Sequence, residues 1–125
     1  MKGSILLVED DELLCDVLSR HLTQRGYEVV VEPSAEAALE RLGTGLHPAL
    51  VLLDINLPGA TGWDLLRAPE LAGAGSPPVV IASATPVSPR KLREYGVAGY
   101  LPKPFPMETL RSTIERLTGA EEDPA

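Results

Sequence analysis

Asp54 is the residue of this chain best placed to do chemistry. Residues 49–53 read Ala-Leu-Val-Leu-Leu and stop at the Asp54 carboxylate, after which Pro58, Gly59 and Gly62 turn the chain back. An apolar run of this length is typical of a strand buried on both faces of a parallel sheet. Such sheets bind ligands beyond the carboxyl ends of their strands. We therefore predict that Asp54 is a nucleophile for phosphoryl groups.

Other polar residues stand at matching places, each just after an apolar run. They are Glu9 and Asp10 after residues 5–8, Ser83 after residues 79–82, and Lys103 after residues 99–101. Because the carboxyl ends of parallel strands lie at one rim of a sheet, we expect these side chains to gather around Asp54.

The gathered carboxylates predict a magnesium site. Carboxylates at one rim repel one another and hold protons more tightly unless a cation compensates. Mg²⁺ takes oxygen ligands, commonly one or two carboxylates together with phosphate oxygens. We expect Asp10 and Asp54 to bind Mg²⁺ directly, Glu9 through water, and a backbone carbonyl of the loop after Asp54 to contribute. Ser83 would donate a hydrogen bond to one phosphoryl oxygen, and Lys103 would hold another by its charge.

An alternation of strand and helix patterns must position these residues. Strands are predicted over residues 5–8, 28–32, 49–54, 79–82 and 99–101. The first helix is predicted to run from the acidic loop to Gly26, and the others cover residues 34–42, 62 to about 72, 89–95 and 107–117. The first helix is predicted because four apolar residues recur at helical spacing, namely Leu14, Val17, Leu18 and Leu22. The second is predicted to bury a stripe made of Ala35, Ala38, Leu39 and Leu42. Five strand–helix units imply an α/β fold, a doubly wound parallel five-stranded sheet with helices on both faces.

Composition limits the function. A chain of 125 residues with 44% hydrophobic residues fits one domain, which we place at residues 1–118 and follow with an acidic tail at 119–125. The formal net charge of −7 disfavours direct binding of nucleic acid or of a membrane surface, since both need a basic face. Cys15 is the only cysteine and no segment approaches spanning length, so the cytoplasm is the expected location.

Four motifs resemble the receiver domain of bacterial two-component response regulators. They are Val-Glu-Asp-Asp at 8–11, Leu-Asp-Ile-Asn-Leu-Pro-Gly at 53–59 with Gly62, Ser83-Ala84, and Tyr-Leu-Pro-Lys-Pro-Phe at 100–105. The resemblance covers essentially the whole chain, and the order and spacing of the motifs are highly specific. It implies a flavodoxin-like (βα)5 fold with strand order 2-1-3-4-5, and a Lys103–Pro104 peptide that can be cis.

The resemblance also implies the role of each site residue. Asp54 is the expected acceptor of a phosphoryl group from a sensor histidine kinase or phosphotransfer protein. Glu9 and Asp10 are the acidic pair, and the backbone carbonyl of Asn56 is a further Mg²⁺ ligand. Ser83 and Lys103 would bind the phosphoryl group. The expected protein is a signalling domain, a monomer or weak dimer, that at most phosphorylates itself from small donors and dephosphorylates itself.

The family's switch would use Ser83 and Tyr100. Phosphorylation adds about 1.5 to 2 negative charges and three acceptor oxygens. These would draw Ser83 toward the phosphoryl group and let Tyr100 rotate inward into the space that Ser83 leaves. The surface formed by residues 89–95, 99–101 and 107–117 would then change toward an unknown output protein. Asn56 and Thr85 stand at positions that in this family tend to tune the access of water to the phosphoryl group.

One stretch departs from the family pattern. Between Ser83 and Lys103 the chain is shorter by about half a helical turn, and Pro86 and Pro89 stand where the fourth helix normally begins. This motivates an alternative, a degenerate receiver that acts as a phosphorylation-independent docking module. A hydrolase or flavin protein is disfavoured, because no second nucleophile–base pair and no Gly-rich phosphate loop is present. The Met1 start and acidic end favour a stand-alone regulator over an excised fragment.

Several other residues have a structural interpretation. Asp11 and Ser34 are predicted helix N-caps, and His21 is predicted to be a half-buried helix residue rather than a ligand. For Trp63, an exposed contact near the site and a packing role are equally supported. A solvated helix face is favoured over a partner patch for three basic residues, Arg90, Lys91 and Arg93.

Overall fold

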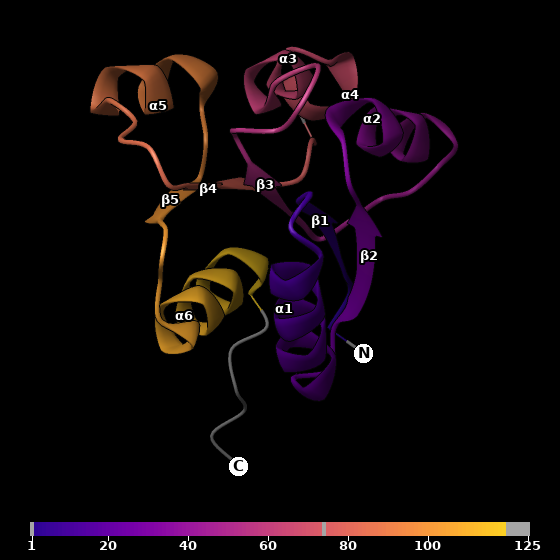
Figure 1. The fold of residues 1–125 in the computed structure, drawn as a ribbon. Helices are drawn as coiled ribbons and strands as arrows, with labels where there is room; N and C mark the ends of the chain where they lie inside the picture. The colour runs from indigo at the N-terminus through magenta and orange to yellow at the C-terminus, as the bar shows by residue number, and fades with distance from the viewer. Residues whose placement is uncertain (1, 74, 120–125) are drawn as a thin grey trace.

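The computed structural model describes residues 2–73 and 75–119, which form a parallel sheet covered by helices on both faces (Figure 1). The strands are β1 (Ser4–Val8), β2 (Glu28–Glu32), β3 (Leu50–Asp54), β4 (Val79–Ser83) and β5 (Gly99–Pro102). All neighbouring strands are parallel, and their order is β2-β1-β3-β4-β5. The predicted fold class and strand order are therefore confirmed.

Six helices lie in the part of the chain that the structure describes. They are α1 (Glu12–Gln24), α2 (Ala35–Gly43), α3 (Gly62–Leu66), α4 (Pro69–Ala72), α5 (Pro89–Tyr95) and α6 (Met107–Thr118). Figure 1 shows α1 and α6 on one face of the sheet and α2 to α5 on the other. This arrangement is the doubly wound layering that the alternation predicts.

The separate helix α4 is a correction to the predicted third helix, which was expected to continue to about residue 72. Pro69 has no N–H with which to extend α3, and its ring disfavours helical geometry at the preceding residue. Ala68 is accordingly extended, with φ −65° and ψ 142°, and Pro69 takes the first turn of the new helix.

Two hydrophobic clusters hold the helices to the sheet. On one face, Leu18 and Leu22 of α1 and Leu110 and Ile114 of α6 pack against side chains of β1, β3 and β4. On the other face, α2, α3 and α4 contribute the remaining core, joined by half-buried residues of α5. Because β1 and β3 are covered on both faces, their side chains are almost entirely buried, which explains why their sequences are continuous apolar runs.

Val17, one of the apolar residues that recur in α1, and Leu39, for which the predicted buried stripe of α2 is wrong, are both exposed. The Val17 and Leu39 side chains are 44% and 38% exposed, respectively. Both helices instead bury residues at positions i, i+3 and i+7: Cys15, Leu18 and Leu22 in α1, and Ala35, Ala38 and Leu42 in α2. Successive helix residues point about 100° apart. Val17 and Leu39 each neighbour a stripe residue in sequence and therefore lie to the side of the buried stripe, where they are partly exposed.

The helix ends follow the predicted caps. The Asp11 side chain accepts a hydrogen bond from the Leu14 N–H at 3.2 Å, and the Ser34 hydroxyl accepts one from the Ala37 N–H at 3.1 Å. Gly26, just beyond α1, has φ +96°, a conformation that favours glycine. The Lys103–Pro104 peptide is cis.

The predicted acidic tail at 119–125 lies outside the described residues except for Gly119. Across residues 2–73 and 75–119, every helix is too short or too polar to cross a membrane.

Candidate functional site

The carboxyl ends of four strands bring the predicted site residues to one rim of the sheet. Glu9 directly follows β1, Asp54 ends β3, Ser83 ends β4 and Lys103 directly follows β5. Glu9, Asp54 and Ser83 are buried, with exposed fractions of 3%, 6% and 1%. Asp10 beside them is exposed, so the rim is open to solvent on the side of the first loop.

Three carboxylates form a compact acidic group. Glu9, Asp10 and Asp54 each offer an oxygen, and these oxygens lie within 4.8 Å of one another. Oxygen donors at this spacing are what a hard divalent cation requires, and the exposure of Asp10 leaves a path for the ion from solvent. The donor set therefore fits Mg²⁺.

Backbone groups fix the orientation of the two buried carboxylates. Glu9 Oε2 accepts hydrogen bonds from the N–H groups of Asp10 and Asp11, both at 3.1 Å. Asp54 Oδ1 accepts one from the N–H of Asn56 at 3.0 Å. Because each loop donates back to the acid that precedes it, the carboxylates are oriented before any ligand arrives.

Lys103 is the cation of the site and contacts both buried acids. Its Nζ lies 2.5 Å from Glu9 Oε1 and 3.4 Å from Asp54 Oδ2. The lysine side chain is 18% exposed, so these interactions are shielded from bulk water. One ammonium group thus serves two carboxylates, and three carboxylates against one lysine leave two negative charges on the group.

Burial and charge shift the proton affinities of this pair. Burial raises the pKa of Glu9 above its ordinary value, with a smaller contribution from the charge of Asp54, although the hydrogen bond from Lys103 works in the opposite direction. For Lys103, burial acts to lower the pKa, but Glu9 and Asp54 outweigh it and hold the pKa above its ordinary value. Lys103 therefore stays charged, and Glu9 binds a proton more tightly than an ordinary glutamate does.

A polar network surrounds the Ser83 hydroxyl. It donates to the carbonyl of Thr85 at 2.8 Å and accepts from the Thr85 N–H at 3.1 Å. The carboxamide Nδ2 of Asn56 donates both to Ser83 Oγ at 3.1 Å and to Thr85 Oγ1 at 3.2 Å. The sequence pointed to the Asn56 carbonyl, but it did not reveal that the side chain bridges β3 to β4; the only available signal was its position two residues after Asp54.

Tyr100 shares an acceptor with Ser83. The tyrosine hydroxyl donates to the Thr85 carbonyl in a long hydrogen bond of 3.5 Å, and the residue is half-buried on β5. The carbonyl of Thr85 therefore lies between the two residues that the sequence assigns to the switch.

The turn after Asp54 requires a glycine where α3 begins. A Cβ atom on Gly62 would lie 2.7 Å from Ile55 Cδ1 and 3.0 Å from the Asp54 carbonyl oxygen. The Gly62 N–H donates to the Ile55 carbonyl at 3.3 Å. A capping box between Thr61 and Asp64 closes the same end of the helix. These contacts hold α3 directly against the strand that carries Asp54.

Other predicted residues lie elsewhere. Trp63 is half-buried and stacks on Tyr95 with ring centroids 4.8 Å apart, so its role is packing. Cys15 is buried behind the site and its Sγ donates to the Glu9 carbonyl at 3.4 Å. His21 is half-buried in α1, as predicted.

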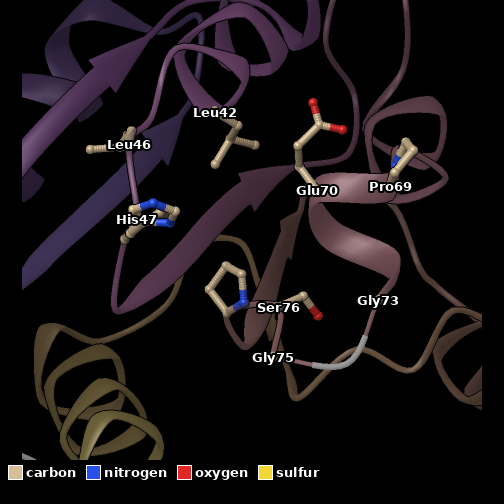
Figure 2. A pocket seen from close by; sticks show the side chains of 10 residues that line it. Leu42, Leu46, His47, Pro69, Glu70, Gly73, Gly75 and Ser76 are labelled. Carbon is tan, nitrogen blue, oxygen red and sulfur yellow. The ribbon is translucent and has the colours of Figure 1, made fainter.

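A recess of about 300 Å³ opens at the opposite end of the sheet (Figure 2). Its lining comes from α2, α4 and the loops before β3 and β4, including Leu42, His47, Glu70 and Ser76. Because these loops lead into the amino ends of the strands, the recess lies away from Asp54. No member of the acidic group lines it.

Comparison with known proteins identifies a family and several curated relatives. A family model described as "Response regulator receiver domain" matches residues 5–115. The response regulator protein FleR of Pseudomonas aeruginosa is 38% identical to 98% of this chain, which spans 27% of FleR. The chain spans about half the length, or less, of the first curated relatives it matches.

Solved structures with the same fold include two receiver domains. The receiver domain of the sensor histidine kinase PA1611 from P. aeruginosa, with a magnesium ion coordinated in its active site cleft, has a TM-score of 0.81 at 25% identity and covers 94% of this chain and 98% of its own. The BeF3-activated N-terminal receiver domain of Klebsiella pneumoniae RstA has a TM-score of 0.80 at 31% identity, covering 92% and 97%.

Proposed function

This chain belongs to the response regulator receiver domain family, and on that premise we propose that Asp54 accepts a phosphoryl group from a phosphohistidine. The observation that carries the proposal is the contact of Lys103 Nζ with both Glu9 and Asp54 at the carboxyl rim of the sheet. A structural ion pair needs only one acid, whereas Lys103 contacts two carboxylates, and the carboxylate of Asp10 lies next to them. The excess negative charge of the three carboxylates favours binding of a metal cation, and the Lys103 ammonium group can bind a phosphoryl oxygen.

In the proposed transfer, a carboxylate oxygen of Asp54 attacks the phosphorus of the phosphohistidine in line. The new O–P bond forms as the P–N bond breaks, the imidazole nitrogen leaves with the electron pair, and Asp54 becomes an acyl phosphate. Most of the catalysis is then positioning and neutralisation of charge. The Asn56 N–H, which donates to Asp54 Oδ1 at 3.0 Å, keeps the carboxylate in place for the attack.

Mg²⁺ is the proposed cofactor, held by Glu9, Asp10 and Asp54 with the Asn56 backbone carbonyl as a further ligand. When bound, the ion neutralises phosphoryl oxygens and aligns the donor with the acceptor. The spacing of the three acids supports this proposal, as does the magnesium ion in the cleft of the PA1611 receiver. Lys103 then turns from the carboxylates toward a phosphoryl oxygen.

The proposed switch starts at Ser83. To donate to a phosphoryl oxygen, its hydroxyl must leave the Thr85 carbonyl, which it now contacts at 2.8 Å. Tyr100 donates weakly to the same carbonyl and can follow the movement of this loop. The change reaches α5, β5 and α6, which form the proposed surface for an output protein.

The proposed partners are a sensor histidine kinase or phosphotransfer protein, which supplies the phosphoryl group, and an output protein. Residues 1–118 are the proposed folding unit, acting as a monomer or weak dimer. The proposed activity beyond phosphoryl acceptance is limited to self-phosphorylation from small donors and autodephosphorylation. Membership of the receiver domain family, together with a relative named as a response regulator, supports a signalling role.

Acetyl phosphate tests the proposal directly. The wild-type protein should gain the mass of one phosphoryl group in the presence of Mg²⁺, and the gain should disappear with EDTA or in Asp54→Asn. Asp16→Asn removes an exposed acid of α1 and is the matched control. An equal gain in Asp54→Asn, or none in the wild type, would exclude Asp54 as the acceptor.

The degenerate receiver remains the second candidate. The short helix α5, which has no fully buried residue, is the observation that favours it. A docking module that ignores phosphorylation would capture the same partners before and after treatment with acetyl phosphate. Capture that depends on phosphorylation would exclude this alternative.

A further inference from the structure

Four side chains join α3 to α5, and we call them the α3–α5 clasp: Trp63 of α3 and Arg67, the residue that caps its carboxyl end, with Lys91 and Tyr95 of α5. The Trp63 and Tyr95 rings stack with centroids 4.8 Å apart and a 41° angle between their planes. Lys91 Nζ lies 4.7 Å from the centre of the Trp63 ring. Arg67 Nη2 donates to the Tyr95 hydroxyl at 2.7 Å, and its Cζ lies 5.7 Å from the Tyr95 ring.

The pairing has a simple geometric basis. Trp63 and the C-cap residue Arg67, whose backbone still has helical geometry, are four residues apart, as are Lys91 and Tyr95. Each helix therefore presents one ridge of two side chains. Each ridge combines an aromatic ring with a cation, and each cation lies against a ring of the other helix. Aromatic stacking and cation–π contacts therefore reinforce one another across the gap.

Helix α5 has little else to hold it. None of its seven residues is fully buried, and only Leu92 and Tyr95 are half-buried against the core. Within the described residues, no carboxylate forms a salt bridge with a cation of α5. The clasp thus supplies a large share of the contacts that set the position of α5.

On the α3 side, the clasp is connected to Asp54 through the first residues of the helix. Helix α3 begins at Gly62, which packs so closely on the Asp54 backbone that a Cβ would lie 3.0 Å from the Asp54 carbonyl oxygen. The next residue is Trp63. A shift of the turn that follows Asp54 must therefore move the start of α3 and the Trp63 ring with it. This route from Asp54 to α5 passes through neither Ser83 nor Tyr100.

We propose that the α3–α5 clasp holds α5 in the resting arrangement and that phosphorylation of Asp54 loosens it through α3. The proposal rests on the proposed function, since it concerns how the same site is read out. Coupling requires that the clasp be stronger in one arrangement than in the other, and by linkage such a difference also changes the affinity of the acceptor site.

Trp63 is the only tryptophan of the chain, so its emission reports on the clasp directly. The experiment titrates the full chain with beryllium fluoride in the presence of Mg²⁺, following Trp63 emission and, separately, the bound fluoride by ¹⁹F NMR. We expect the emission to change in proportion to occupancy in the wild type and in Tyr100→Ala. Unchanged emission at full occupancy, or a response lost in Tyr100→Ala, would overturn the proposal. Absence of bound fluoride would instead overturn the proposed function.

The affinity for beryllium fluoride supplies the second readout. Tyr95→Leu keeps an apolar side chain but removes the ring and the hydroxyl, so it should raise this affinity by about two- to tenfold, the range of one lost aromatic contact. Tyr95→Phe removes only the Arg67 hydrogen bond and should have a smaller effect in the same direction. Arg93→Ala, on α5 outside the clasp, is the control and should leave the affinity unchanged. Unchanged or weaker binding by both Tyr95 variants would contradict the assignment to the resting arrangement.

Discussion

Lys103 donates to Glu9 with an N–O distance of 2.5 Å although 94 positions separate the two residues along the chain. The same ammonium group lies 3.4 Å from Asp54, the proposed acceptor. The cation therefore holds together the carboxyl ends of β1, β3 and β5. It only partly balances three carboxylates, and the remaining charge determines how the site should respond to mutation and to Mg²⁺.

Asp54→Asn should stabilise the protein in the absence of Mg²⁺. The substitution removes one of three mutually repelling carboxylates and keeps an oxygen for the Asn56 N–H, so we expect the free energy of unfolding to rise by on the order of 1 kcal/mol. Urea denaturation in EDTA measures this change. Mg²⁺ should then stabilise the wild type more than the variant, because binding to the folded state alone raises its stability. A variant less stable than the wild type in EDTA would show that repulsion is not the dominant effect.

Lys103→Met should have the opposite effect. Removing the cation leaves Glu9 and Asp54 buried with backbone N–H donors but without a positive charge, and breaking such a pair costs about 2 to 4 kcal/mol for a lysine that is partly exposed. Part of the loss should be recovered when Mg²⁺ is added, since the ion supplies the missing positive charge. Arg116→Gln, an exposed cation of α6, is the control. A loss of stability that Mg²⁺ does not reduce would argue against an ion beside these carboxylates.

Gly62→Ala should disturb both stability and phosphorylation. The added Cβ would lie 2.7 Å from Ile55 Cδ1, and relieving such overpacking costs about 1 to 3 kcal/mol. The displacement falls on the turn after Asp54, so the rate of phosphorylation from acetyl phosphate should drop as well. Gly43→Ala is the matched control, because its Cβ would meet nothing closer than 3.9 Å and lies within a helix. Equal behaviour of the two variants would contradict the predicted clash.

Cys15 should make part of the stability depend on alkaline pH. Burial, together with the charges of Glu9 and Asp11, raises the pKa of the Cys15 thiol from 9.0 to about 11. The unfolded thiol thus ionises first as the pH rises, so the stabilising contribution is complete below pH 9.0 and is lost as the pH passes about 11. The difference in free energy of unfolding between wild type and Cys15→Ala should shrink across this window. A constant difference would show that the thiol is not shielded.

Much of the fold follows from local sequence. The strands β1, β3 and β4 are continuous apolar runs because both of their faces are covered, and the caps Asp11 and Ser34 act on donors only three residues away. The break between α3 and α4 also has a local cause in Pro69, which the sequence contained but the predicted third helix overlooked.

The sequence by itself determined which residues stand at the carboxyl ends of the strands, because strand alternation and parallel pairing depend on short-range patterns. Only the tertiary structure decided that Lys103 contacts Glu9 more closely than Asp54, that the Asn56 side chain reaches Ser83, and that Trp63 stacks on Tyr95. These contacts join segments from different strands and helices. Their distances are set by how the layers pack, which no local pattern encodes.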